Sequence, residues 1–429
     1  MKKIRPILIG FIFILNVAWQ AEARDLLQFL QSQPDLSDIR EMEGNGLFNN
    51  LYQLKIRQPL NHNDTTAGFF NQRVFVAERA VDRPVVLITE GYSAEYAAQP
   101  NYINELSLLL DANQICVEHR YFGESVPDSI AWQYLTVENA ARDHHRITQL
   151  FKLYYSGKWL NTGISKGGQT ALAHRAIFPD DVSMTVAYVA PLNFGVQDGR
   201  HEGFLAQVGS ETCREKIMAF QREILKRRKQ MVALLKNYSD ARKYNYPISM
   251  DEVLDFSVLE YSYSFWQWGH SAHEIPDLSA DDQTLFKHFV KISPPDYFSK
   301  EGSAHYRAFF YQAARELGYY GYDTKPFTDL LSIASASGYL RRFMIPGNQP
   351  VPYHPETSQM VNNFLQNHAK NILLIYGEID PWSASAASVR KRGNNKVIVL
   401  PGGCHKARIQ DLPTHQKNKL LKSMKKQLH

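Results

Sequence analysis

The chain alternates between strand-like and helix-like segments in its first half, and this alternation limits its possible folds more than any other feature. Between Leu51 and about Ala190, short apolar runs are separated by segments with helical spacing. The expected strands are 71–78, 84–89, 114–118, 159–162 and 184–189, and the expected helices are 136–155 and 166–178. Strands and helices that follow one another in this way predict an α/β fold with a mostly parallel sheet, covered by helices on both faces.

A long helical segment interrupts the alternation. From about Arg200 to about Met344 the residues follow helical spacing and are rich in aromatics, and strand-like runs return at 371–377 and 396–403. The two parts of one sheet must then pair across the interruption. We therefore expect a core built from residues 24–200 and 346–429, with residues 201–345 inserted as a helical cap.

The N-terminus has the order of a secretory signal peptide. Lys2, Lys3 and Arg5 precede an apolar run at 7–18, and Ala21-Glu22-Ala23 follows with small residues at the cleavage positions. The run is shorter than the roughly 20 apolar residues that a bilayer requires. We expect residues 1–23 to be removed, and the protein to be exported by a bacterium to the periplasm or medium without a membrane anchor.

The charge of the chain argues against nucleic acid as a partner. The formal net charge is +5, and residues 1–23 carry three bases and one acid, which leaves the remainder near +3. This balance is too mild for a nucleic-acid-binding protein. The one dense basic run, residues 226–229, lies within a segment of helical spacing at 214–237. We expect it to form the solvated face of an amphipathic helix.

The three cysteines, Cys116, Cys213 and Cys404, leave at least one thiol unpaired within the chain. Cys116 lies in an apolar strand-like run, which predicts a buried free thiol. If a disulfide forms, Cys213 and Cys404 are the favoured pair.

The segment Gly163-Ile-Ser165-Lys-Gly167 lies between an expected strand and an expected helix. A strand-to-helix turn with glycine two residues to either side of a serine is typical of the elbow that holds a nucleophile. An ordinary glycine-rich turn is the alternative.

Two further residues complete a possible catalytic triad. Asp380 follows the strand at 371–377, and His405 follows the strand-like run at 396–403. Open α/β sheets build their sites at this edge of the sheet. An Asp before proline also forms turns, and Gly-Gly-Cys-His could be a metal loop, but the three residues occur in the chain order Ser, Asp, His. We therefore predict that His405 takes the proton of Ser165, that Asp380 orients His405, and that Ser165 attacks an acyl carbon.

The oxyanion formed by such an attack needs two hydrogen-bond donors. The backbone N–H of Lys166 directly follows the nucleophile, and Gly91 and Tyr92 follow the strand at 84–89. Only a backbone role is expected for Lys166, with its side chain at the surface.

A second cluster of polar residues lies in Glu118–Ser125, which reads EHRYFGES. Its spacing does not suit a compact metal site, and no metal is predicted. Arg120 and Glu124 are expected to be buried, paired groups that shape the loop. Three further residues, Asp143, His144 and His145, are expected on the solvated face of a helix.

Five segments together resemble the bacterial secreted tripeptidyl-aminopeptidase family of serine peptidases, which is related to lysosomal prolyl carboxypeptidase and its dipeptidyl-peptidase cousin. They read TGISKGG, EHRYFGES, TVENAARD, EIDPWS and GGCHKAR, and they span roughly residues 51–408. The resemblance implies an α/β-hydrolase core, a helical cap, no cofactor, and removal of short peptides, expected to be tripeptides, from free N-termini. The lysosomal relatives have an elbow closer to Gly-Ser-Tyr-Gly-Gly. The Ile-Ser-Lys-Gly-Gly of this chain favours the aminopeptidase branch and argues against a strict preference for proline.

An enzyme that counts residues from an N-terminus needs a carboxylate to bind the terminal ammonium. Glu90 lies in the turn of the oxyanion donors, and Glu316 lies in FYQAAREL, which resembles a segment of the relatives' helical insertion. The expected wall around Glu316 is aromatic and consists of Phe309, Phe310, Tyr311, Tyr319 and Tyr320. Alternatively, Glu316 is a helix-surface acid that pairs with Gln312 or Arg315.

Two other functions remain open at this point. A secreted lipase or esterase would use the same triad, and a silent binding protein could share the fold. The presence of Ser165, Asp380 and His405 argues against a protein without catalytic activity.

Overall fold

The computed structural model describes residues 25–44, 46–347 and 350–428, so the predicted signal peptide lies outside the described residues. Its centre is a nine-stranded sheet in the order β1-β2-β3-β5-β4-β6-β7-β8-β9. The strands are β1 (Leu36–Glu41), β2 (Asn50–Pro59), β3 (Phe69–Glu78), β4 (Val85–Thr89), β5 (Asn113–Val117), β6 (Trp159–Ile164), β7 (Met184–Tyr188), β8 (Ile372–Gly377) and β9 (Lys396–Leu400). Pairing is antiparallel from β1 to β5 through β3, and parallel from β5 to β9. The mostly parallel α/β prediction is confirmed.

Helices cover both faces of the parallel strands, and alternate residues of each strand belong to different clusters. In β8, Leu374 packs in the cluster that includes α4, whereas Ile375 packs in the cluster that includes α12. The helices of this part are α1 (Leu26–Gln31), α2 (Glu105–Leu110), α3 (Val137–Phe151), α4 (Lys166–Ile177), α11 (Glu356–Asn367) and α12 (Thr414–Leu428). Because both faces are covered, the central strands are continuous apolar runs, such as VVLIT in β4.

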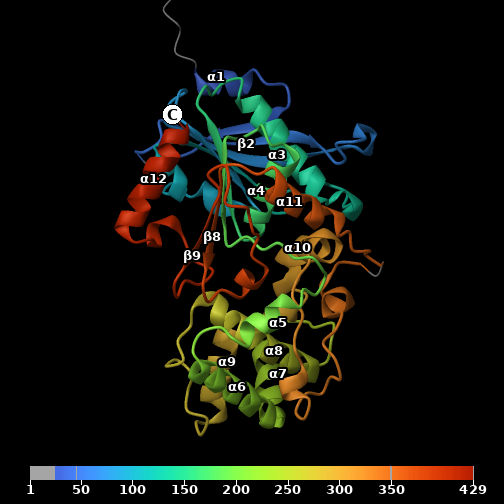
Figure 1. Cartoon of the computed structure of the whole chain (residues 1–429). Coiled ribbons are helices and arrows are strands. Elements are labelled where there is room, and N and C mark those ends of the chain that lie inside the picture. The colour runs from blue at the N-terminus through green and yellow to red at the C-terminus, as the bar shows by residue number, and fades with distance from the viewer. Residues whose placement is uncertain (1–24, 45, 348–349, 429) are drawn as a thin grey trace, which may run out of the picture.

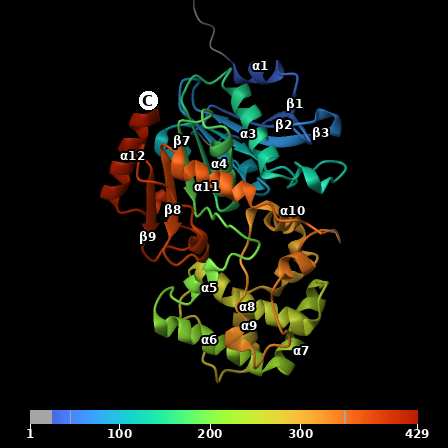
Figure 2. The same ribbon diagram turned by 45° about the vertical axis from the view of Figure 1, so that its right-hand side comes forward.

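A block of helices, residues 200–344, stands between β7 and β8 in the chain. In Figures 1 and 2 it lies beyond one end of the sheet. Its α-helices are α5 (Arg200–Leu205), α6 (Glu211–Lys226), α7 (Arg228–Arg242), α8 (Met250–Trp268), α9 (Asp282–Ile292) and α10 (Arg307–Gln312). The strands β7 and β8 pair directly, so the sheet continues across this insertion in the chain. Within the described ranges, every helix is too short or too polar to cross a bilayer.

The single amphipathic helix expected at 214–237 is instead two helices, because the chain breaks at Arg227 between α6 and α7. The prediction that the basic run forms a solvated face is also wrong for Arg227 and Arg228. Arg227 donates to the carbonyls of Ala280 and Leu278, and Arg228 pairs with the buried Asp255. These two cations hold the helices of the block together.

The expected solvated face of α3 is wrong as well. Asp143 is fully buried by Arg120 and the loop after β2, and His144 is fully buried against His174 of α4. His145 is partly exposed and lies 2.8 Å from Asp181. Arg120 donates to both oxygens of Asp143 at 2.7 Å, which confirms a buried, paired arginine. Glu124 differs from its expectation, since its side chain is 47% exposed while it pairs with Arg73.

Candidate active site

Ser165 stands at the junction of β6 and α4, in a backbone conformation that serine rarely adopts. Its φ is 55° and its ψ is −121°, and its N–H donates to the Tyr188 carbonyl of the adjacent strand at 2.8 Å. The side chain is partly exposed, and Oγ has no hydrogen-bond partner among the described residues. Such strain is characteristic of a nucleophile elbow.

The glycine before this serine is required by close packing. A Cβ at Gly163 would lie 2.1 Å from the Gly167 carbonyl oxygen, because the chain folds back on itself within four residues. No side chain could occupy that space without opening the turn. This explains one of the glycines in the Gly-x-Ser-x-Gly pattern.

Asp380 and His405 meet although 25 residues separate them. His405 Nδ1 lies 2.7 Å from Asp380 Oδ2, and the buried carboxylate accepts a second bond from Trp382 N–H at 3.1 Å. An ionised carboxylate only accepts, so Nδ1 carries the proton and Nε2 is left to accept one. This is the arrangement of a histidine general base and its orienting acid.

The neighbouring acid and cysteine have other positions. Glu378 accepts from the Gly402 N–H at 2.7 Å, so its carboxylate belongs to the turn after β9. The favoured disulfide is absent, since Cys116, Cys213 and Cys404 are all free thiols. Cys404 packs against Gly269 at the end of α8, whereas Cys213 lies in the first turn of α6. Cys116 is buried in β5, as predicted.

The expected oxyanion donors lie together beside the elbow. A Cβ at Gly91 would lie 2.7 Å from the Gly167 nitrogen and 2.8 Å from the Lys166 carbonyl carbon, so the loop after β4 packs directly on the start of α4. Within the described part of the chain, neither the Lys166 N–H nor the Tyr92 N–H has a hydrogen-bond partner. Two unpaired donors are thus available near Ser165.

The prediction that the Lys166 side chain lies at the surface is wrong. It is 2% exposed, and its amine donates to the Gly91 carbonyl at 2.5 Å. The amine also lies over the rings of Tyr92 and Phe122, 5.5 and 5.0 Å from their centroids. The helix start after an elbow faces the adjacent loop rather than solvent, and this is why the residue is buried.

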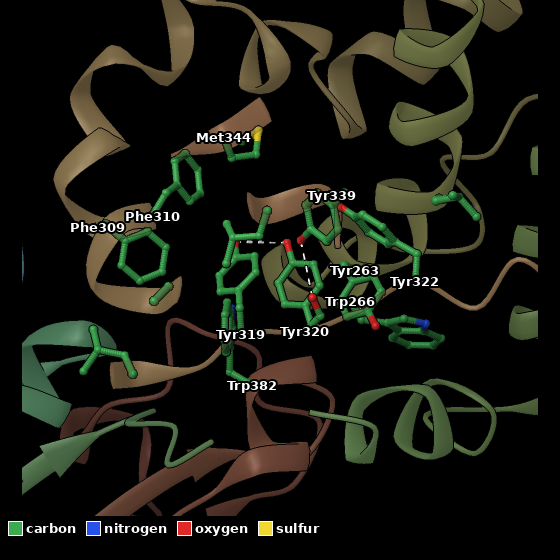
Figure 3. Packing of buried hydrophobic residues seen from close by; sticks show 14 of the residues in the cluster. Tyr263, Trp266, Phe309, Phe310, Tyr319, Tyr320, Tyr322, Tyr339, Met344 and Trp382 are labelled. Carbon is green, nitrogen blue, oxygen red and sulfur yellow. Dashed lines mark hydrogen bonds between the residues drawn. The ribbon is translucent and has the colours of Figure 1, made fainter. Parts of the chain in front are cut away.

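The helical block contacts each part of this site. His405 N–H donates to the Gln267 carbonyl of α8 at 3.0 Å, and Phe309 packs edge-on against Tyr92. Trp382, two residues after Asp380, packs against Tyr319 and Tyr320, as Figure 3 shows. Of the aromatic residues expected as a wall, Phe309, Tyr319 and Tyr320 therefore lie in a row that runs from the loop after β4 to the loop that holds Asp380.

Sequence reasoning missed Glu260 of α8, which lies behind this row. Its buried carboxylate accepts from the hydroxyls of Tyr320 at 2.9 Å, Tyr322 at 2.7 Å and Ser264 at 3.1 Å. Burial raises the pKa of Glu260 to about 7, although the three hydroxyls oppose the shift. The apolar aromatic run around it in the sequence gave no sign that a carboxylate would be buried there.

This raised pKa predicts a pH-dependent stability that Glu260→Gln should remove. A buried acid whose folded pKa exceeds its unfolded value destabilises the fold as pH rises between the two values. The free energy of unfolding of Glu260→Gln, relative to wild type, should increase by about 1–3 kcal/mol from pH 5 to pH 8. Denaturant unfolding at both pH values measures it. An equal difference at the two pH values would show that Glu260 does not titrate in this range.

The two acids expected to bind an N-terminus are in different surroundings. Glu90 is partly exposed, accepts from the Tyr96 hydroxyl, and has its pKa raised to about 7 by burial. Glu316 is 7% exposed and accepts from the Val137 N–H at 2.8 Å, so it caps the start of α3. Burial raises its pKa too. The alternative of a helix-surface acid that pairs with Gln312 or Arg315 is wrong, because Glu316 is buried and its carboxylate binds the start of α3.

Across the described ranges, no three His, Cys, Asp or Glu side chains are arranged to hold a metal ion. The loop after β4 packs on the start of α4 beside Ser165, and Asp380 and His405 pair with each other after β8 and β9. Such a set transfers acyl groups.

Comparison with known proteins agrees with this chemistry. Residues 20–425 match the PS-10 peptidase S37 family. A prolyl tri/tetrapeptidyl aminopeptidase of Streptomyces mobaraensis is 31% identical over 372 residues, which cover 85% of this chain and 77% of the relative.

Solved structures are more distant. A proline iminopeptidase of Mycobacterium smegmatis has a TM-score of 0.42 and 12% identity, over 87% of this chain and 98% of that one. Carboxyl esterase 2 of Tuber melanosporum has a TM-score of 0.37 and 9% identity, over 96% and 90%. Neither likeness bears on the activity.

The sheet order, the elbow and the family match agree with one another: the chain has an α/β-hydrolase core and belongs to the PS-10 peptidase S37 family, as a serine aminopeptidase.

Proposed function

We propose that this chain is an exported exopeptidase that releases tripeptides, or peptides of similar length, from free N-termini through an acyl-enzyme at Ser165. The observation that carries the proposal is the 2.7 Å contact between His405 and Asp380, together with a strained serine whose side chain makes no capping hydrogen bond to α4. The resemblance of the N-terminus to a signal peptide supports export to the periplasm or medium.

In the proposed mechanism His405 Nε2 accepts the Ser165 proton while Oγ attacks the carbonyl carbon of the bond to be cut. Asp380 holds Nδ1–H and stabilises the imidazolium that forms. The Lys166 and Tyr92 N–H groups bind the oxyanion. His405 then gives its proton to the leaving amine, and a water molecule hydrolyses the ester in the reverse sense. No cofactor takes part.

We also propose that residues 201–345 act as a cap on a core made of residues 24–200 and 346–429. The contacts of Gln267 with His405, of Phe309 with Tyr92 and of Tyr319 with Trp382 support this division. A cap that contacts all these loops would limit the number of substrate residues that fit between the N-terminus and the cut bond.

We propose that a carboxylate at the edge of the space between cap and core binds the ammonium group of the substrate. Glu90 is the more accessible of the two acids, since it lies on the oxyanion loop and is partly exposed. Glu316 is the second candidate. Its raised pKa would fall when an ammonium binds beside it.

Acetylation of the substrate's N-terminus tests whether the enzyme recognises the free terminal ammonium. Acetylated peptides should be cut tens-fold less efficiently than free ones by wild type, because a charge-assisted bond of roughly 2–3 kcal/mol is lost. Glu90→Gln or Glu316→Gln should raise KM for free peptides by a similar factor, and the responsible variant should lose little more on acetylation.

Steady-state kinetics on matched peptides, with product masses, measure this. Glu356→Gln removes an exposed acid of nearby α11 and serves as the charge control. Equal cutting of free and acetylated peptides would replace the proposal with an endopeptidase. Activity on esters alone would replace it with an esterase.

A further inference from the structure

Lys166 buries its amine directly after the proposed nucleophile. Its side chain is 2% exposed, and it forms no salt bridge within the described ranges, although the Glu90 carboxylate is close enough to interact with it electrostatically. Burial lowers the pKa of this amine well below its usual value. Burying a lysine amine without a direct salt bridge costs stability, so an apolar residue here would be the more stable choice.

The amine holds one particular peptide group. It donates to the Gly91 carbonyl at 2.5 Å, and Gly91 itself packs on the first turn of α4. The Gly91 N–H stabilises the Glu90 carboxylate, and the Tyr92 carbonyl accepts from His119 N–H at 3.1 Å. The groups on either side of the Tyr92 N–H are therefore all engaged, and that N–H has no hydrogen-bond partner among the residues that the structure describes.

The Gly91 carbonyl and the Tyr92 N–H belong to the same planar trans peptide, so they point in opposite directions. A hydrogen bond that holds the Gly91 carbonyl in place therefore also fixes the direction of the Tyr92 N–H. We propose that the Lys166 side chain is a positioning group that orients the Tyr92 N–H as the second oxyanion donor, while the Lys166 backbone supplies the first. One residue would then set both halves of the oxyanion hole.

This geometry also strengthens the donor. A hydrogen bond accepted by a peptide carbonyl polarises its amide and makes its N–H a better donor. The rings of Tyr92 and Phe122 around the amine keep water from competing for the Gly91 carbonyl. The inference rests on the proposed acyl transfer at Ser165.

The test is Lys166→Met, which keeps the length of the side chain and removes its donor. We expect kcat to fall about 10- to 100-fold, part of the 10²–10³ that one oxyanion donor contributes, with KM changed less than about 2-fold. A peptide aldehyde forms a tetrahedral adduct with the serine, so its inhibition constant should rise by the same factor as kcat falls. The inhibition constant of a product tripeptide should not change.

Lys158→Met, an exposed lysine just before the start of β6, is the matched control and should behave as wild type. Titration with a fluorophosphonate counts competent sites and separates positioning from misfolding. A lower count with full kcat per site would mean that Lys166 is only structural. If Lys166→Met does not fold, Lys166→Leu also removes the donor and gives the same comparison.

Unchanged kcat and aldehyde affinity in a folded variant would overturn the inference. If Ser165→Ala is inactive and Lys166→Met is fully active, this inference alone fails. If Ser165→Ala stays active, the proposed function fails instead.

Discussion

Ser165→Ala is expected to lower kcat by roughly 10⁶-fold and to abolish covalent labelling by a fluorophosphonate, without unfolding the protein. The serine is held at φ 55° between β6 and α4, where alanine fits the same backbone and only Oγ is lost. Residual turnover would come from binding and the oxyanion donors alone. Steady-state assays on a free-N-terminus peptide, with circular dichroism to confirm folding, measure the effect.

Ser183→Ala is the matched control, since Ser183 precedes β7 at the opposite end of the sheet and donates to the Trp159 carbonyl. It should keep wild-type activity. Labelling that persists in Ser165→Ala would mean that the elbow serine is not the nucleophile.

His405→Ala and the double variant His405→Ala/Ser165→Ala should be nearly equally inactive. Triad members act as a unit, so removing the second costs little once the first is gone. Asp380→Asn should follow closely, with kcat reduced roughly 10⁴-fold, because an amide facing Nδ1 favours the wrong imidazole tautomer.

Glu378→Gln changes the neighbouring acid, which binds the Gly402 N–H, and is expected to remain active. Near wild-type activity in Asp380→Asn would require another acid, with Glu378 the nearest. Additive losses in the double variant would also contradict a triad.

The parallel sheet could be predicted because its strands are buried on both faces. Segments such as VVLIT and ILLIYG are continuous apolar runs, and each ends in polar or glycine residues at the carboxyl edge. Their local sequence therefore carries both the strand and the position of the site. The same holds for α3, which begins after Thr136, a residue type common at helix caps, and Thr136 accepts from the Asn139 N–H.

Burial of charged groups could not be predicted, because it depends on partners far along the chain. Asp143 has the spacing of a solvated helix position, yet Arg120 reaches it from the loop after β5. Lys166 follows a serine in a polar run, yet the loop after β4 covers it. Glu260 is surrounded by aromatics, and its three hydroxyl partners come from two separate segments. In each case the tertiary contact reverses the local preference.

The surroundings of the two acids proposed to bind the substrate's N-terminus could be predicted only in part. The sequence identifies Glu90 and Glu316 as acids near the expected site, but not that Glu316 caps α3 through Val137. Glu316 is 7% exposed whereas Glu90 is partly exposed, so the structure shifts the balance of the proposal toward Glu90.

Mapping of the fluorophosphonate adduct under competition tests the central claim most directly. Wild-type protein is labelled with or without a free-N-terminus tripeptide or its acetylated form, then digested with trypsin and analysed by mass spectrometry. The account predicts the adduct on Ser165, in the peptide from Trp159 to Lys166, with protection by the free tripeptide and little by the acetylated one. An adduct on another residue, or equal protection by both peptides, would contradict it.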